Sequence, residues 1–149
     1  MSTKMRVSLH GKQFGLSHEN NLISEGIQIT QPCVDASITV GDESSNARAI
    51  AIQLKDSRGE DIDYVETVEI IMFLNATQLA FVATGGSTGI AIGTDGALLT
   101  VIAKKLFLAT SEADGDIDLS WTDTGTEVAF LGVRLPSGRI VMSSALTNA

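Results

Sequence analysis

The stretch that decides the fold is Asp116-Ile117-Asp118-Leu119-Ser120-Trp121-Thr122-Asp123, in which polar and apolar residues alternate. Successive side chains of a β-strand point to opposite faces of a sheet, so Ile117, Leu119 and Trp121 share one face and the polar residues share the other. The pattern predicts a strand with one buried and one solvated face. Similar stretches recur from residue 47 to the C-terminus, separated by short turns, which is typical of an all-β sandwich or barrel.

The other expected strands are 34–40, 48–55, 65–74, 127–135 and 140–146. Residues 98–103 and 106–110 are expected to form one long or two broken strands, and 78–84 either a short strand or a connection. Turns are expected at 56–59, 112–115, 124–126 and 136–138, a loop at 41–46, and a hairpin turn at Asp95-Gly96. A helix is the competing prediction for 65–74 and ranks second, because Val, Thr, Ile and Phe are enriched there and the segment is short. Seven to nine strands in about 120 residues predict an immunoglobulin-like β-sandwich, without the Cys…Trp…Cys signature of antibody domains.

The beginning of the chain differs in texture from the rest. Val7-Ser8-Leu9 has the pattern of a short strand, but 11–21 mixes Gly, Ser, His, Asn and Lys without periodicity. We therefore expect residues 1–28 to form an irregular N-terminal arm and residues 29–149 to form the sandwich domain. Arms of this kind stay mobile or become ordered against a neighbour, which costs entropy on binding.

The chain of 149 residues is acidic, with a formal net charge of −8. Phosphate binding needs clustered cations, and Lys104-Lys105 is the one adjacent basic pair, so a nucleic-acid partner is not expected. No apolar run approaches the roughly 18 residues of a membrane span, and the N-terminus lacks the apolar segment of a secretory signal. The single cysteine, Cys33, cannot form an intramolecular disulfide, which fits folding in a reducing cytosol.

The run from Gly85 to Gly96 is rich in glycine but lacks the features of a phosphate site. A P-loop needs a lysine after its last glycine, and a dinucleotide site needs a βαβ unit, neither of which is present in the sequence. We expect a flexible loop. Cys33 as a catalytic thiol would need a histidine and an acid beside it. Because His10 and His18 lie in the irregular arm, Cys33 is expected to be a buried small hydrophobe.

Carboxylates occupy alternate positions before Trp121, as they do at the start of an EF-hand loop. They are Glu112, Asp114, Asp116 and Asp118. Counted from Asp114, the sixth residue is Leu119 and the twelfth is Gly125, where calcium binding needs Gly and Glu. We therefore expect these acids to be the solvated face of the strand and not a metal site.

A second group of acids raises the question of acid–base catalysis. Its members are Asp61, Asp63, Glu66 and Glu69. Catalysis would require burial or like-charge pairing to shift a pKa, and the pattern favours a solvated loop and strand face. Trp121 and Tyr64 form no aromatic cluster for stacking on a sugar, so core packing is expected for Trp121. No catalytic, cofactor-binding or metal-binding residue is assigned, no cofactor is expected, and we do not expect an enzyme.

Four stretches nevertheless resemble structural proteins of tailed bacteriophages. They are Ala51-Ile52-Gln53-Leu54-Lys55-Asp56-Ser57-Arg58-Gly59, Gly93-Thr94-Asp95-Gly96-Ala97-Leu98-Leu99, Ala113-Asp114-Gly115-Asp116-Ile117-Asp118-Leu119 and Val133-Arg134-Leu135-Pro136-Ser137-Gly138. The resemblance spans about residues 47–146 and is to small β-sandwich head decoration (cement) proteins or fibre-like capsid components. It is mostly turn chemistry and carries no catalytic residue over.

The resemblance implies a protein that is made in the host cytoplasm and coats the outer surface of the capsid shell in the virion. Its expected partners are the major capsid protein and further copies of itself, in a dimer or trimer. Many weak contacts on a symmetric lattice give a stable coat through avidity. Residues 1–28 lie outside the resemblance, and we hypothesise that they anchor the protein. The alternatives are a tail or fibre component, a glycan-binding β-sandwich module with weak affinity, and, third, a small hydrolase.

Overall fold

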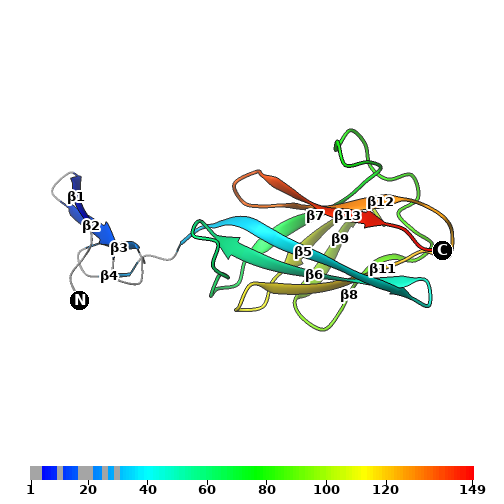
Figure 1. Ribbon diagram of the computed structural model, residues 1–149, viewed down its shortest axis with the longest axis horizontal. Helices are drawn as coiled ribbons and strands as arrows, with labels where there is room; N and C mark the ends of the chain where they lie inside the picture. The colour runs from blue at the N-terminus through cyan, green and yellow to red at the C-terminus, as the bar shows by residue number, and fades with distance from the viewer. Residues whose placement is uncertain (1–4, 10–11, 17–21, 25–26, 29–30) are drawn as a thin grey trace. The chain divides into compact units, whose positions relative to one another are not determined.

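The computed structural model describes residues 5–9, 12–16, 22–24, 27–28 and 31–149. The chain divides into two compact units, Met1–Pro32 and Cys33–Ala149. Each unit has its own β-structure (Figure 1).

The first unit contains four short antiparallel strands that pair in chain order. They are β1 (Met5–Leu9), β2 (Lys12–Leu16), β3 (Leu22–Ser24) and β4 (Ile27–Gln28). The strand expected at Val7-Ser8-Leu9 is the end of β1. Strand β2 lies within the stretch 11–21, where alternation of Phe14 and Leu16 with their neighbours is too brief to stand out in the sequence. His10 and His18 lie outside the described residues.

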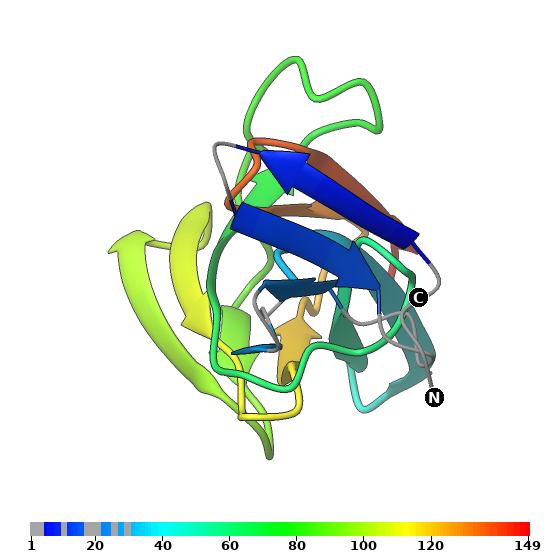
Figure 2. The same ribbon diagram turned by 90° about the vertical axis from the view of Figure 1, so that its left-hand side faces the viewer.

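The second unit is an all-β sandwich of nine antiparallel strands in two sheets, which confirms the predicted fold class. In spatial order, the five-stranded sheet is β13 (Ile140–Leu146), β12 (Ala129–Arg134), β7 (Thr67–Phe73), β10 (Leu106–Thr110) and β9 (Ala97–Ile102). The four-stranded sheet is β5 (Cys33–Ser44), β6 (Ala47–Asp56), β11 (Asp116–Thr122) and β8 (Gly89–Ile92). Figure 2 shows the strands of this unit in a view turned by 90° about the vertical axis.

The strand order explains why the sandwich is immunoglobulin-like. With the β9–β10 hairpin set aside, seven strands remain in the second unit. Numbered along the chain, they pair as first-second-fifth-fourth in one sheet and third-sixth-seventh in the other, which is the order of an immunoglobulin constant domain. The β9–β10 hairpin is an addition that joins the edge of the second sheet through β10 and β7.

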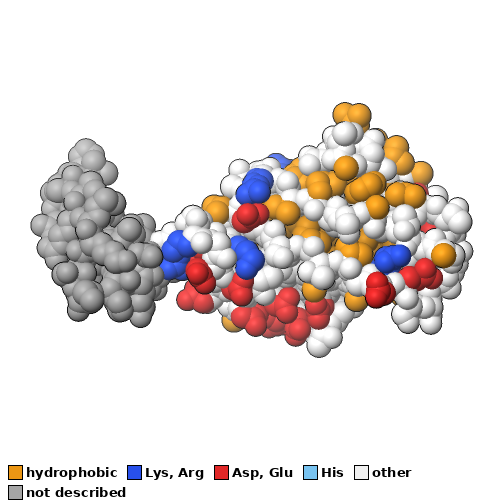
Figure 3. All heavy atoms as spheres, viewed as in Figure 1, with side chains coloured by type: hydrophobic (Ala, Val, Ile, Leu, Met, Phe, Trp, Pro, Cys, Tyr) orange, Lys and Arg blue, Asp and Glu red, His pale blue; other side chains and the backbone are white. Residues whose placement is uncertain are grey.

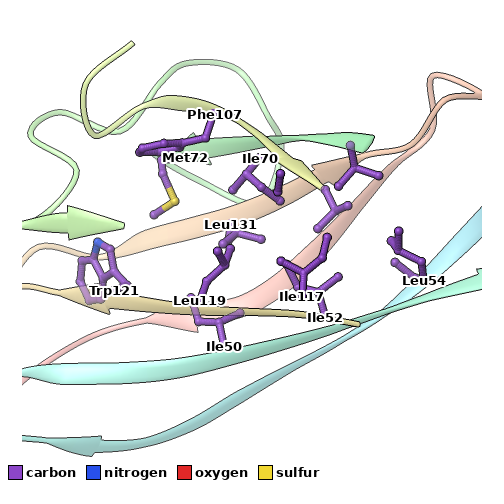
Figure 4. Packing of buried hydrophobic residues seen from close by; sticks show 14 of the residues in the cluster. Ile50, Ile52, Leu54, Ile70, Met72, Phe107, Ile117, Leu119, Trp121 and Leu131 are labelled. Carbon is purple, nitrogen blue, oxygen red and sulfur yellow. The ribbon is translucent and has the colours of Figure 1, made fainter. Parts of the chain in front are cut away.

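The core lies between the two sheets and is filled by the apolar residues that alternate with polar ones along the strands (Figure 4). The largest buried side chains include Ile50, Ile52 and Leu54 of β6, Ile117 and Trp121 of β11, Ile70 and Met72 of β7, Phe107 of β10 and Leu131 of β12. Each contributes about 1.5–3 kcal/mol on burial. The indole Nε1 of Trp121 donates a hydrogen bond to the carbonyl oxygen of Gly85 at 3.2 Å, so even its polar atom is satisfied. The predicted core role of Trp121 is confirmed.

The central strand of the five-stranded sheet is β7, within the segment 65–74 for which a strand was ranked above a helix. Val68, Ile70 and Met72 face the core, while Phe73 on the other face is 7% exposed. Both faces are therefore largely covered at this end of β7. Segment 78–84 is mainly a connection, held to β7 by an isolated bridge between Phe73 and Phe81.

Two turn predictions are wrong. The loop expected over 41–46 is confined to Ser45-Asn46, where φ values of 54° and 63° allow a two-residue hairpin, and β5 continues to Ser44. The guanidinium of Arg48 donates to the carbonyl oxygen of Gly41 at 3.0 Å and holds the extended ends together. Asp95-Gly96 does not close a hairpin, because β8 pairs with β11 and β9 pairs with β10. The turn instead carries the chain from one sheet to the other.

Candidate functional site

The outer faces of the two sheets differ in chemistry. The outer face of the four-stranded sheet carries mainly small and polar side chains: Ser37, Thr39, Ala49, Ala51, Gln53, Asp116, Asp118 and Ser120. The outer face of the five-stranded sheet carries apolar side chains from three strands: Ile71 of β7, Leu106 and Leu108 of β10, and Leu99 of β9. Exposed apolar side chains that gather on one surface mark an interaction site more reliably than scattered ones.

This apolar face is built on β7 by strand register. Ile71 lies opposite Leu106 on one side and opposite Gly132 on the other, so the three positions form one row across the sheet. Gly132 is required there, because a Cβ at this position would lie 2.6 Å from Cε2 of Phe73. The aromatic ring of Phe73 can therefore pack flat against the sheet beside Ile71.

The connection 74–82 folds back over one end of this face and adds apolar side chains to it. It is held by hydrogen bonds from Leu74 N to Ala80 O at 3.0 Å and from Val82 N to Met72 O at 2.9 Å. Val82 is fully buried and fixes the returning chain, whereas Leu79 is 81% exposed and Phe81 is 44% exposed. In Figure 1 this green loop projects from the upper side of the sandwich. It presents two large apolar side chains on a well-anchored backbone.

Two shallow hollows lie side by side on this outer face. The first has a volume of about 410 Å³ and is lined by Ile71, Phe73, Leu79, Ala80, Phe81, Leu106 and Gln78, with Glu69 and Arg134. The second has a volume of about 320 Å³ and is lined by Glu66, Thr67, Val68, Leu108, Leu135, Pro136 and Gly138, again with Glu69 and Arg134. We call the two hollows together the outer groove. Its first half is apolar and its second half is mixed.

An ion pair separates the two halves of the outer groove. Glu69 of β7 and Arg134 of β12 are direct cross-strand neighbours, and Arg134 Nη1 lies 3.1 Å from Glu69 Oε2. The two side chains are 37% and 52% exposed, so the pair contributes only about 0.2–1 kcal/mol to stability. It retains hydrogen-bond donors and acceptors to which a partner can bind. The outer groove thus offers apolar contact on both sides of one polar, orienting pair.

Figure 3 shows hydrophobic side chains over β12 and β13 in the upper part of this view, and acidic side chains along the lower edge beneath β6.

The acids at the start of β11 lie on the solvated face, as predicted for Asp116 and Asp118. Partial burial, followed by the neighbouring charges of Asp118 and Asp95, raises the pKa of Asp116. Within the described residues, no group of three or more His, Cys, Asp and Glu side chains could hold a metal ion.

The first half of the glycine-rich run is tied down and is not the flexible loop that the sequence suggests. The carboxylate of Glu127 accepts hydrogen bonds from Thr84 Oγ1 at 2.6 Å and from the backbone N–H groups of Thr84, Gly85 and Gly86 at 2.9 Å each. Lys104 Nζ donates to the carbonyl oxygens of Gly86 and Ser87. Partial burial alone would raise the pKa of Glu127, but the hydrogen bonds from Thr84, Gly86 and Gly85 outweigh it and lower that pKa. These contacts from Glu127 and Lys104 to residues 84–87 fix the loop, and we call them the clasp.

Of the remaining candidate acids, Glu66 and Glu69 both line the second hollow, and three of the acids each have a local partner of their own. Asp61 pairs with Lys55 at 2.7 Å, Glu69 pairs with Arg134, and Glu66 Oε1 accepts from the N–H of Thr67. Each is engaged locally, as expected of a solvated loop and strand face.

The aromatic and thiol predictions also have clear outcomes. Trp121 is fully buried and offers no platform to a sugar, and Tyr64 packs partly buried against the core. Cys33 is 4% exposed, and burial, followed by the charge of Glu66, raises the pKa of its thiol. The predicted burial of Cys33 is confirmed.

The sequence reading missed the outer groove. The available signal was the second apolar row of β7, Ile71 and Phe73, together with Leu79 and Phe81 a few residues later. The structure covers Phe73 but leaves the groove beside Ile71 open.

No protein-family model matches the sequence, and no curated protein matches it. Among solved structures, a cohesin module from a family 33 glycoside hydrolase of Clostridium perfringens ATCC13124 is similar at 16% identity and a TM-score of 0.43. The match covers 80% of this chain and 97% of that module. No helix among the described residues is long and apolar enough to span a membrane.

Proposed function

We propose that this protein is a non-enzymatic structural protein that binds another protein through the outer groove. The observation that carries the proposal is the apolar outer face beside β7, with Leu79 and Phe81 exposed on an anchored loop. Large apolar side chains exposed together, and bordered by a polar pair such as Glu69–Arg134, have the composition of a protein–protein interface. A groove of this size accepts a few apolar side chains of a partner surface.

The resemblance of residues 47–146 to phage structural proteins suggests what that partner is. We propose that the protein is a head decoration protein and that the outer groove docks on the major capsid protein at the outer surface of the shell. The outer face of the four-stranded sheet, which carries Asp116 and Asp118 among small and polar side chains, would then point away from the shell, where negative charge keeps neighbouring particles apart. A decoration protein that binds only the mature shell stabilises it by mass action.

The proposal is tested by binding the purified protein to phage heads that lack it, followed by quantitative mass spectrometry of the washed particles. Leu79→Lys removes an 81% exposed apolar side chain from the groove without touching the core. We expect it to weaken binding about tenfold. Thr39→Lys introduces the same charge on the exposed outer face of the four-stranded sheet and serves as the matched control.

Four outcomes separate the alternatives. Binding that falls for Leu79→Lys but not for Thr39→Lys supports docking through the groove. A copy number far below the number of shell subunits points to a tail or fibre component instead. Equal binding of both variants refutes the groove as the docking site. A glycan-binding module would show affinity for sugars in the absence of heads, and its stacking residue would have to be other than the buried Trp121.

A further inference from the structure

The five-stranded sheet ends at β9, and no strand of the described residues pairs with its outer edge. The edge is uncovered as well as unpaired. Leu99 is 63% exposed, Val101 is 53% exposed and Ile102 is 43% exposed. An exposed, apolar edge strand is a template for pairing with another chain, because its backbone N–H and C=O groups and its side chains all need a partner.

This edge differs from the other three in the sandwich. β8 is only four residues long, and β13 and β5, the edges of the two sheets on the opposite side, pack beside each other. β9 consists of Ala97-Leu98-Leu99-Thr100-Val101-Ile102 and contains neither a charge nor a proline, the usual devices that block edge pairing. Its register shift beside Val101 leaves Ala97 to Thr100 as the regular stretch available to a new strand.

Charges of opposite sign lie at the two ends of β9. Before it come Asp95 and the carboxylate of Glu112, which accepts a hydrogen bond from the N–H of Gly96 at 3.2 Å. After it comes the turn that contains Lys104 and Lys105. An antiparallel pair of identical strands places the start of one beside the end of the other. The acidic end of each copy therefore meets the basic end of its partner.

We propose that β9 pairs with β9 of a second copy, antiparallel and about a two-fold axis, so that two five-stranded sheets join into one. With the axis at Leu99, the segment before β9 in each copy, which carries Asp95, runs toward the turn after β9 in the other copy, which carries Lys104 and Lys105. The contact is isologous and closes at a dimer, so it does not propagate into a fibre. The occupant of the edge is a second copy of this chain, because the end charges of β9 are complementary to themselves.

The proposed dimer contact is made by β9 alone, so it does not depend on whether the protein binds a capsid. It complements the proposed function, because Leu99 lies opposite Leu108 on the same face as the outer groove. In the dimer the two apolar outer faces become one continuous surface.

The test is sedimentation equilibrium of the full chain over a concentration series. We expect a reversible dimer for the wild type. Leu99→Lys places a charge on each side of the axis and is expected to raise the dissociation constant by about a hundredfold or more. The side chain at this position is 63% exposed, so the variant should fold, and its thermal transition verifies this. Leu79→Lys, a matched change outside β9, is expected to leave the dimer intact.

A charge exchange tests the antiparallel direction. Asp95→Lys and Lys105→Glu are each expected to weaken the dimer about tenfold, because each puts like charges together at both ends of the contact. The double variant restores complementarity and is expected to return the dissociation constant to within about threefold of the wild type. Lys105 is chosen because Lys104 also holds the clasp at Gly86 and Ser87.

A wild-type chain that remains monomeric at 0.1 mM or so would overturn the proposal, as would an oligomer that Leu99→Lys leaves unchanged. Failure of the double variant to recover would overturn the antiparallel arrangement. The proposed function is tested separately, because Leu79→Lys tests the groove in the head-binding assay and Leu99→Lys tests the β9 edge in sedimentation. The two proposals can therefore be refuted independently.

Discussion

The clasp at Glu127 gives a sharp test of how the loop between β7 and β8 is held. Its carboxylate accepts four hydrogen bonds from Thr84, Gly85 and Gly86, and the adjacent Asp123 accepts one from the N–H of Ser87 at 3.0 Å. A hydrogen bond to a charged group contributes about 1.5–3 kcal/mol, and partial solvent exposure reduces the sum well below four times that value. We expect Glu127→Ala to lower the free energy of unfolding by about 2–4 kcal/mol.

Glu127→Gln keeps the shape of the side chain but replaces one acceptor oxygen by a donor that faces backbone N–H groups. We expect a loss of about 1–3 kcal/mol for this variant. Each kcal/mol corresponds to about 2–4 °C in Tm for a chain of this size. Glu60→Gln, a change at an exposed glutamate, is the matched control and should leave Tm nearly unchanged. Differential scanning calorimetry measures all three variants.

The pH dependence of this effect has a definite sign. The pKa of Glu127 in the folded protein lies below its ordinary value of 4.5, so deprotonation favours the folded state. The contribution is fully present above that ordinary value and is lost as the pH falls through the lowered folded pKa. The Tm difference between wild type and Glu127→Gln should therefore be constant near neutral pH and shrink in acid. A difference that is absent at pH 7, or that grows below pH 4 or so, would refute the clasp.

Four further predictions concern other sites. Gly132→Ala should lower stability by about 1–3 kcal/mol in denaturant titration, because the new Cβ would lie 2.6 Å from the ring of Phe73; an unchanged midpoint would contradict this packing. Asp56→Asn should lower the free energy of unfolding by about 2–4 kcal/mol, because the 3% exposed carboxylate accepts hydrogen bonds from Arg58 and Glu60. Burial alone would raise the pKa of Asp56, but the hydrogen bonds from Arg58 outweigh it and lower that pKa. The stability advantage of the wild type over Asp56→Asn should therefore fade in melts at acid pH. The thiol of Cys33 should react with a thiol reagent at the rate of unfolding, and rapid labelling of the native protein would count against its burial. Deletion of residues 1–28 should leave the melting transition of the sandwich in place and reduce occupancy on heads, and unchanged occupancy would end the anchoring hypothesis.

The alternation of apolar residues predicted most of the sandwich, because burial between two sheets imposes a period of two on every inner strand. Ile50, Ile52 and Leu54 on β6 and Ile117, Leu119 and Trp121 on β11 are all buried, as their spacing requires. The loop expected over 41–46 was wrong because composition does not show that two residues, Ser45-Asn46, suffice for the turn.

Long-range relations were less accessible from the sequence. Asp95-Gly96 has the local chemistry of a hairpin, but which strands pair is decided by the core, and the two flanking strands belong to different sheets. The outer groove depends on Ile71, Leu106 and Gly132 lying in one row, although they are far apart in the chain. A pattern within one strand identifies its two faces but not the neighbours that leave a hollow on one of them.

The groove and the β9 edge together suggest how a weak contact can hold a protein on a lattice. A single groove contacts only a few apolar side chains of a partner protein and would give modest affinity. If two copies join at β9, Leu99 of each copy lies at the junction and both grooves lie on one continuous sheet surface, so that binding of the first groove presents the second at a high effective concentration. Leu99→Lys should then weaken attachment to heads even though Leu99 is absent from the lining of the groove, and Leu79→Lys should weaken it while the dimer persists. Loss of attachment in the second variant alone would mean that the groove acts as a monomeric site and that pairing at β9 serves another purpose.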